Sequence, residues 1–209
     1  MNNNIIGMIE AKDLMQTDIV CWACQKQLST RALFCNHCGA IQPVRALDHF
    51  ARLGLERRID IDQTTLDRQY AAMRKTFDPE RFAIHSMAER NYAAKHSQTL
   101  AEAYETLRDP VQRGRYWLGL HNLEFEENQA TIPLVQEMRL ACEQALTARE
   151  IDHVAQRASL ALEEGIMRLM QSLRQQNWQN ANLTLLELDG MEDVLMQARS
   201  KRQDLVQGG

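Results

Sequence analysis

Apolar residues recur at three- and four-residue intervals along most of this chain, a spacing that predicts amphipathic helices. Two such segments, Asp62–Thr76 and Ser86–Leu107, lie on either side of Pro79. Proline lacks a backbone donor and disfavours helical geometry in the residue before it, so the first helix should end near Phe77 or Asp78. The pattern predicts a helical hairpin with a polar, exposed tip. An Asp-Pro pair by itself would mark no more than the connection between two helices.

Two shorter helices are expected at the ends of this hairpin. Leu47–Leu55 has a helical pattern that Gly54 stops, and Asp62 is well suited to cap the first long helix. After a break at Pro110, Val111–His121 has an aromatic and aliphatic face. The order short helix, long helix, tip, long helix, short helix resembles that of a J-domain.

Three further helical patterns fill the rest of the chain. They start near Leu134, Ile151 and Trp178, and each places apolar residues on one face. We expect Thr131 to cap the first of them and Gly190 to interrupt the last, because glycine costs about 1 kcal/mol inside a helix. Short connections between amphipathic helices predict an antiparallel three-helix bundle.

Four of the five cysteines form two Cys-x-x-Cys pairs near the start of the chain. Two such pairs can place four thiolates around one tetrahedral zinc ion and leave no open position for a substrate. Gly39, directly after the second pair, suits the tight turn of a metal knuckle. The fifth cysteine, Cys142, lies on an amphipathic helix and is expected to be a buried thiol. We predict a structural zinc site, in preference to two disulfides or a redox centre, with the ligands Cys21, Cys24, Cys35 and Cys38.

Composition narrows the functional classes. A net charge of −4 gives no general case for nucleic-acid binding, and no apolar run approaches the ~20 residues of a membrane span. The N-terminal residues lack the basic start and apolar core of a secretory signal, so we expect a cytoplasmic protein, or a mitochondrial-matrix protein if the source is a eukaryote. Neither a Gly-rich phosphate loop nor a Ser/His/Asp set stands out, so we expect an adaptor and not an enzyme.

Three segments carry a resemblance to a known family: LDHFARLGLERRIDID, LDRQYAAMRKTFDPERFA and LAEAYETLRDPVQRGRYWLGLHN. They resemble the Hsc20/HscB co-chaperones of iron–sulfur cluster assembly, which are J-proteins that deliver a cluster scaffold protein to an Hsp70. The resemblance runs from Cys21 to about Leu205 and is strongest over residues 47–122. It implies a mainly α fold with a flexible N-terminus (1–18), a zinc-binding tetracysteine module (19–43), a J-domain (44–122), a linker (123–130) and a scaffold-binding three-helix bundle (131–209).

The tip departs from the family pattern. Hsc20/HscB proteins carry His-Pro-Asp there, and this chain carries Asp78, Pro79 and Glu80. In J-proteins this tripeptide triggers ATP hydrolysis by Hsp70. Glu80 keeps a carboxylate one methylene further out, while Asp78 replaces an imidazole with a negative charge. Two hypotheses follow: a working co-chaperone whose Hsp70 matches the altered tip, or a J-like protein that has lost the trigger and acts only as a scaffold-binding or regulatory adaptor.

The resemblance also implies two partner surfaces. The Hsp70 surface comprises the tip and a basic face: Asp78, Pro79, Glu80, Arg68, Arg74, Lys75 and Arg81. The scaffold surface lies on the first bundle helix and comprises Leu134, Val135, Met138, Glu137 and Glu143. The aromatic residue that the family places late in the last helix falls near Gly190. From the pattern alone, the cations would be an ordinary solvated helix face, and the leucine and methionine positions would be core.

Other functions fit the residues less well. A zinc enzyme needs an open metal position, and a zinc-ribbon nucleic-acid binder needs a basic surface. We expect an Hsp70-type chaperone and an iron–sulfur scaffold protein as partners, with no nucleic acid and no membrane. A homodimer joined through the zinc module stays open.

Overall fold

The computed structural model describes residues 19–30, 32–121, 123 and 132–207. They fall into two compact units. The first unit comprises Met1–Asp48 and Tyr70–Ala101, and the second comprises His49–Gln69 and Glu102–Gly209. The predicted flexible N-terminus, most of the predicted linker and Thr131 lie outside the described residues. Within the described ranges, no helix combines the length and the apolarity that a bilayer span requires.

A small module of turns and short strands opens the first unit. Strand β1 (Ile19–Val20) pairs antiparallel with β2 (Gln27–Leu28), and a single bridge joins Phe34 to Ile41. Among its described residues, a small buried apolar cluster comprises Cys21, Leu28 and Cys35, with Ile19, Cys24 and Ala32 partly buried against it. A core this small supplies little folding energy, so the module needs other sources of stability.

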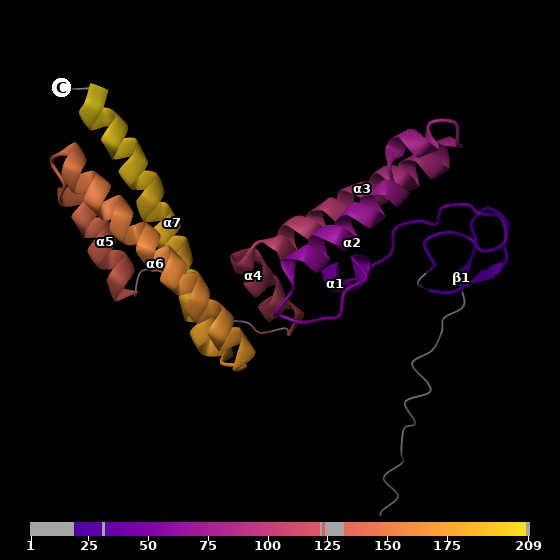
Figure 1. The fold of residues 1–209 in the computed structure, drawn as a ribbon, viewed down its shortest axis with the longest axis horizontal. Coiled ribbons are helices and arrows are strands. Elements are labelled where there is room, and N and C mark those ends of the chain that lie inside the picture. Colours follow the sequence, from indigo (N-terminus) through magenta and orange to yellow (C-terminus); the bar gives the residue numbers. More distant parts are fainter. Residues whose placement is uncertain (1–18, 31, 122, 124–131, 208–209) are drawn as a thin grey trace, which may run out of the picture. The chain divides into compact units, whose positions relative to one another are not determined.

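The predicted hairpin is present. Helix α2 (Gln63–Thr76) and helix α3 (Met87–Arg108) are its long helices (Figure 1), and each is divided between the two units. Asp62 accepts a hydrogen bond from the backbone N–H of Thr65 at 2.7 Å, which confirms the predicted cap. Helix α2 ends where Pro79 predicts, and the tip forms one turn of 3₁₀ helix, Pro79–Phe82.

The second unit contains the two short helices expected at the ends of the hairpin. Helix α1 (His49–Arg52) ends before Gly54, whose φ of +66° is the left-handed conformation that glycine adopts readily. Helix α4 (Pro110–Leu120) begins with its cap at Asp109. The buried ring of Phe50 packs edge-to-face on Trp117 with centroids 5.8 Å apart, which ties α1 to α4.

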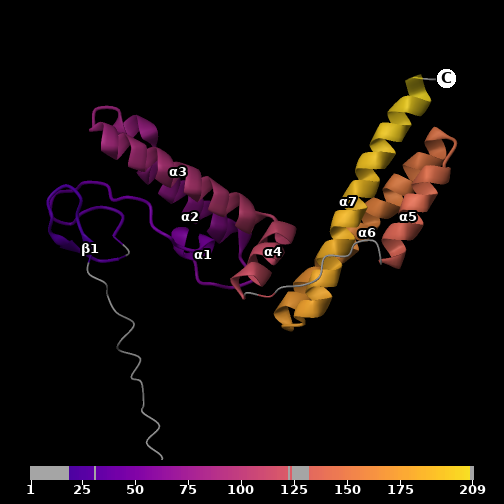
Figure 2. The same ribbon diagram turned by 180° about the vertical axis from the view of Figure 1, so that it is seen from behind.

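The expected three-helix bundle follows in the same unit. It consists of α5 (Pro133–Gln144), α6 (Ala148–Arg174) and α7 (Trp178–Gln207), which lie side by side in both views (Figures 1 and 2). Thr147 and Glu150 form a capping box that starts α6. Helix α5 has Ile132 at its N-cap position, without a side-chain capping bond, and the cap expected at Thr131 falls on a residue outside those described.

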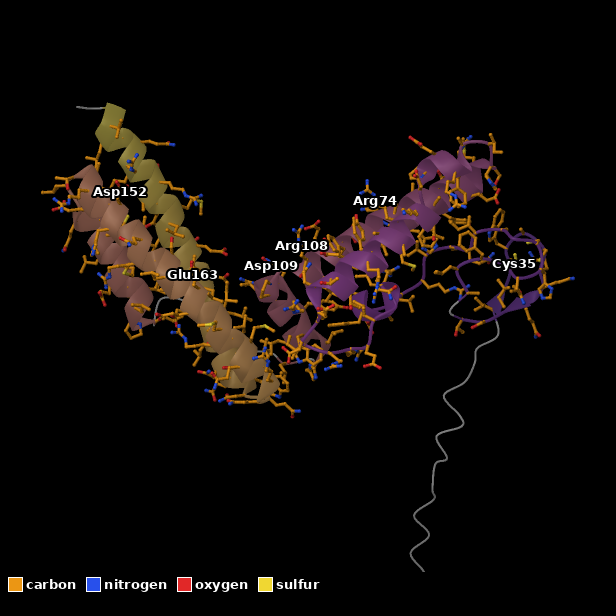
Figure 3. The ribbon with its side chains drawn as sticks, in the orientation of Figure 1. Cys35, Arg74, Arg108, Asp109, Asp152 and Glu163 are labelled. Atoms are coloured by element: carbon orange, nitrogen blue, oxygen red, sulfur yellow. The ribbon has the colours of Figure 1, made fainter. Side chains whose placement is uncertain are left out.

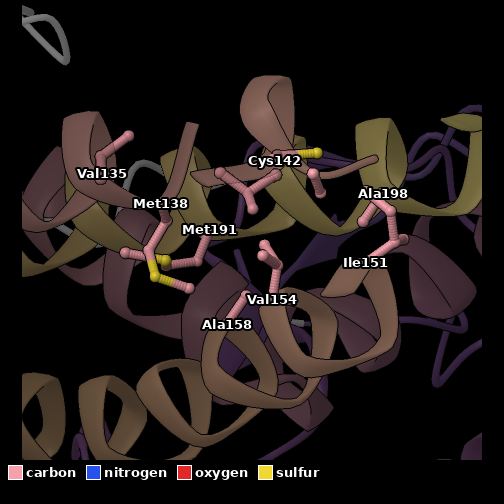
Figure 4. Packing of buried hydrophobic residues seen from close by; sticks show 10 residues of the cluster. Val135, Met138, Cys142, Ile151, Val154, Ala158, Met191 and Ala198 are labelled. Carbon is pink, nitrogen blue, oxygen red and sulfur yellow. The ribbon is translucent and has the colours of Figure 1, made fainter. Parts of the chain in front are cut away.

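The prediction that Gly190 interrupts the last helix is wrong. Helix α7 continues through Gly190, and the absence of a side chain at this residue lets α5 approach closely. A Cβ atom at position 190 would lie 2.6 Å from Cγ1 of Val135. Val135 and Met138 belong to the buried cluster of the bundle, together with Met191 (Figure 4).

Helix α4 packs against the bundle within the second unit. Val111 and Leu118 join a buried cluster with Leu169 of α6 and residues of α7. A Cβ atom at Gly114 would lie 3.0 Å from Leu169, so α4 approaches α6 closely at this glycine. An ion pair between Arg115 of α4 and Asp189 of α7 braces the contact.

Candidate metal centre and partner-binding surfaces

The two Cys-x-x-Cys turns have the same backbone geometry. In each, the N–H of the first cysteine donates to the carbonyl five residues on, and the N–H four residues on donates back to the carbonyl of that cysteine, all at 2.9 Å. The residues with positive φ are equivalent: Gln25 at +60° and Gly39 at +77°. The tight turn predicted at Gly39 is therefore confirmed. Both turns aim their sulfur atoms into one space, near the labelled Cys35 in Figure 3.

The four sulfur atoms have the spacing of a tetrahedral metal site. Cys21 and Cys38 lie 3.7 Å apart, Cys24 and Cys35 lie 3.6 Å apart, and all four sulfurs lie within 4.8 Å of one another. Four sulfurs at about 2.3 Å from a tetrahedral ion should lie about 3.8 Å apart, whereas a disulfide needs about 2.05 Å. The residues therefore fit a four-coordinate metal ion. His37 is exposed and is not part of the group.

Hydrogen bonds to sulfur lower the pKa of two of the cysteine thiols. Burial acts to raise the pKa of the Cys21 thiol, but hydrogen bonds from Cys24, Ala23 and Gln42 outweigh it and lower the pKa to about 6. The pKa of Cys35 is lowered by the same balance. The N–H of Ala40 lowers the pKa of Cys38, but burial and three neighbouring cysteines raise it to about 12. Cysteine binds a metal ion as the thiolate, so binding of a cation at this site would release protons from the thiols.

The metal centre is connected to the hairpin through Gln42. Its side chain donates to Cys21 Sγ at 3.4 Å and to the carbonyl of Ala40 at 2.7 Å. Its backbone carbonyl lies 2.9 Å from Nε2 of His96, a buried residue of α3. Sequence reasoning missed both residues. The signal for His96 was present, because it occupies an apolar-face position between Ala93 and Leu100 on α3.

The tip is held by side chains that bond to the backbone. Asp78 accepts a hydrogen bond from the N–H of Glu80 at 3.0 Å and caps the 3₁₀ turn. Arg81 donates to the carbonyl of Lys75 at 3.0 Å, at the C-terminal end of α2. Arg90 donates to the carbonyl of Ala83 at 3.3 Å. The turn is therefore fixed at both ends while Glu80 stays exposed.

The cations predicted to face an Hsp70 are all exposed. Arg74 and Lys75 lie on the part of α2 in the first unit, and Figure 3 labels Arg74. Arg68 lies on the part of α2 in the second unit. Arg81 differs from the prediction in one respect, because its guanidinium is turned back onto the end of α2.

The structure divides the residues that were predicted to bind the scaffold. Val135 and Met138 are 0% and 1% exposed, so their side chains face the bundle core and not solvent. Leu134 is half-buried against the same cluster. Glu137 and Glu143 are exposed, and Glu137 pairs with Arg157 of α6 at 2.5 Å. The i, i+3, i+4 stripe of α5 is its core face, as the pattern alone indicated.

Sequence reasoning missed the most exposed apolar residue of α5. Leu140 is 52% exposed and lies three residues from both Glu137 and Glu143. The sequence signal for Leu140 was that it is apolar and lies outside the i, i+3, i+4 stripe of α5. Nearby, Arg139 pairs with Asp193 of α7 at 3.3 Å. The outer face of α5 therefore presents one apolar side chain between two carboxylates.

Comparison with known proteins finds similarity to HscB co-chaperones. No protein-family model matches the chain. It is 32% identical over 111 residues to the iron–sulfur cluster co-chaperone protein HscB of Mus musculus, covering 51% of this chain and 47% of that protein. It is 32% identical over 108 residues to the co-chaperone protein HscB of Proteus mirabilis, covering 52% and 61%. Over about half of its length the chain is therefore similar to HscB co-chaperones.

Other HscB proteins extend the match. The HscB homolog of Arabidopsis thaliana is 29% identical over 167 residues, covering 77% of this chain and 66% of that protein. Against these curated relatives the chain thus spans from about half to about two thirds of their length, 47% to 66%.

Solved structures share the fold. The crystal structure of human HscB has a TM-score of 0.77 at 21% identity and covers 88% of this chain and 98% of its own. HscB from Vibrio cholerae has a TM-score of 0.64 at 23% identity, covering 76% and 99%. In this fold, α1 to α4 comprise the predicted hairpin and its two short helices, α5 to α7 form the C-terminal bundle, and the two Cys-x-x-Cys turns precede them.

Proposed function

We propose that this protein is a co-chaperone of iron–sulfur cluster assembly that delivers a cluster scaffold protein to an Hsp70 and stimulates its ATPase. The observation that carries the proposal is its similarity to proteins named HscB co-chaperone from a mouse, a plant and a bacterium. The protein acts as an adaptor between two partners and does no chemistry of its own. It works in the cytoplasm, or in the mitochondrial matrix if the source is a eukaryote.

The Hsp70 contact is assigned to the tip and to the basic residues beside it. Glu80 is exposed on a turn that Asp78 and Arg81 hold in place, which supports its role as the contacting carboxylate. A carboxylate presented by a fixed turn suits a bidentate bond to an arginine of the partner. The exposed cations of α2 steer an acidic partner surface toward the tip: Arg68, Arg74 and Lys75.

The scaffold contact is assigned to the outer face of α5. The exposed residues Glu137, Leu140 and Glu143 supply one apolar group between two acidic ones, with Leu134 at the edge. Val135 and Met138 support this surface from below, because they hold α5 to α7. An apolar anchor with a polar rim is the usual composition of a protein–protein contact.

The metal is proposed to be zinc in a structural role, held by Cys21, Cys24, Cys35 and Cys38. All-cysteine sites with tetrahedral spacing are typical of structural zinc, and they leave no position for a substrate. Residues 19–43 are the zinc module, 44–122 the J-domain and 131–209 the scaffold-binding bundle in this assignment. Such a small module takes most of its folding energy from the ion.

Single-turnover ATP hydrolysis by the Hsp70 of the source organism tests the proposal. The chaperone is assayed alone, with this protein, with the scaffold protein, and with both. The expected result is stimulation by this protein that increases when the scaffold is added. No stimulation by the natural chain, together with a gain in the Asp78→His, Glu80→Asp double variant, would contradict the proposal and leave only a binding role.

A further inference from the structure

The metal-binding module packs on the helices that carry the tip, and both lie in the first unit. Each Cys-x-x-Cys turn contributes one aromatic residue to this contact. Trp22, inside the first pair, lies edge-to-face on Tyr92 of α3 with centroids 5.6 Å apart, and its ring N–H donates to the carbonyl of Ile41 at 2.8 Å. Phe34, directly before the second pair, stacks on Phe77 at 5.8 Å and an interplanar angle of 7°.

Phe77 is the residue at which the contact meets the tip. It follows the last residue of α2 and directly precedes Asp78. Its ring is 1% exposed and stacks nearly parallel to two other rings, Phe34 at 5.8 Å and His96 at 4.4 Å. The backbone position of Asp78 is therefore set by a ring that the module covers.

A hydrogen-bonded path runs beside the aromatic one. Gln42 joins the metal centre to α3, because its side chain bonds Cys21 Sγ and its carbonyl bonds His96. His96 in turn stacks on Phe77. The aromatic path starts at Phe34, one residue before Cys35, and the hydrogen-bonded path starts at the sulfur of Cys21. Both paths end at Phe77.

We propose that the metal-loaded module positions the Asp78-Pro79-Glu80 turn, with Phe34, Phe77 and His96 as positioning residues. The proposal deepens the proposed function and rests on it for the role of the turn. Without the ion, the module loses its main source of folding energy, since its own buried cluster is small. Phe77 then loses Phe34, and His96 loses the carbonyl of Gln42. The packing around Phe77 is then lost, while the bundle of the second unit keeps its own core.

Hydrogen exchange of backbone amides, read by mass spectrometry on the full chain, tests the link without reference to activity. The metal content is counted first, and the natural protein is then compared before and after chelation. We expect exchange over residues 77–85 to accelerate at least severalfold on chelation, along with exchange over 19–43, while α5 to α7 are unchanged. If residues 19–43 open and residues 77–85 keep their protection, the proposal is overturned. Finding no bound metal in the natural protein overturns it as well.

A second variant separates the contact from the metal. Phe34→Ala keeps all four cysteines and removes the ring from Phe77, and Val20→Ala is the matched control because Val20 is 56% exposed on the same module. One aromatic pair changes a local opening equilibrium by about 2- to 12-fold. We therefore expect Phe34→Ala to retain metal, to accelerate exchange over 77–85 by a factor in this range, and to raise the concentration needed for half-maximal Hsp70 stimulation. Metal retention with tip exchange equal to that of Val20→Ala overturns the proposal.

Failure of the proposed function and failure of the positioning role give different experimental results. If the natural protein does not stimulate the chaperone, the proposed function fails, while the exchange data still decide whether the module positions the turn. If stimulation is present and is unchanged by chelation and by Phe34→Ala, the positioning role fails and the proposed function stands.

Discussion

Gly190 provides the most direct test of the packing of the bundle. It lies in the interior of α7, and a Cβ atom there would lie 2.6 and 2.7 Å from the two methyl groups of Val135. Contacts under 3.0 Å require a shift of side chain or backbone. Since Val135 is fully buried, it has little room to move.

The expected magnitude combines two opposing terms. Alanine is favoured over glycine in a helix by about 1 kcal/mol, and overpacking a well-packed core costs about 1–3 kcal/mol. Gly190→Ala should therefore lower the free energy of unfolding by about 0–2 kcal/mol. Gly119→Ala in α4 is the matched control, because a Cβ atom there has no atom within 4 Å. It should be neutral or should stabilise by up to about 1 kcal/mol, so the two variants should differ by about 1–3 kcal/mol.

Urea unfolding followed by helical circular dichroism measures this difference. A Val135→Ala, Gly190→Ala double variant removes the two methyl contacts under 3.0 Å, so its loss of stability should be smaller than the sum of the single losses by about 1–3 kcal/mol. Equal effects of Gly190→Ala and Gly119→Ala, or strictly additive losses in the double variant, would refute the close approach of α5 and α7.

Three further predictions concern the tip, the scaffold surface and acid stability. Asp78→Ala removes a helix-capping acceptor and should weaken Hsp70 stimulation about fivefold at subsaturating concentration. Asp78→Asn can still cap the turn and should stimulate as the natural protein does. Equal losses in both variants would show that the charge of Asp78 itself is needed. Leu140→Ala should weaken binding to the scaffold at least fivefold in calorimetry, while Leu183→Ala, a control 50% exposed on α7, should bind as the natural protein does. Asp60 bonds Arg174, which lowers the pKa of its carboxyl below the usual value, so this contribution to stability is present above that value and lost as the pH falls through the lowered pKa. The stability gap between the natural protein and Asp60→Asn should therefore be full above about pH 5 and should narrow as the pH falls through the lowered pKa of Asp60, as read from denaturant midpoints.

Local sequence signals predicted the elements well. Asp62 and Pro79 set the ends of α2 by capping and by the missing proline donor, and these effects act within a few residues. The spacing of the cysteines predicted a common site because two tight turns bring four sulfurs together. The periodicity over 134–198 predicted the bundle because each helix has one apolar face.

The errors have a common physical cause, which is contact between residues distant in the sequence. Gly190 has low helix propensity, but its effect is decided by Val135, 55 positions earlier. Val135 was assigned to a partner surface by resemblance, and the same contact makes it core. The role of His96 depends on Gln42 in another module. Propensity is a weak prior that such contacts override.

The altered tip is better explained as a working surface than as a degenerate one. An exposed connection between helices needs no fixed shape, since loops tolerate many conformations. Here three side chains, Asp78, Arg81 and Arg90, each bond to the backbone of the turn or of its flanks. The aspartate that replaces the family histidine is the residue that starts the turn, so the substitution brings a structural role with it. Glu80 then reaches solvent from a fixed base, and its longer side chain extends the carboxylate by one methylene. Under the proposed function, a partner that bonds Glu80 would place its cation further from the turn than a partner matched to an aspartate at this position. Stimulation of the cognate Hsp70 together with weak stimulation of an Hsp70 from a His-Pro-Asp system is the pattern that this geometry requires.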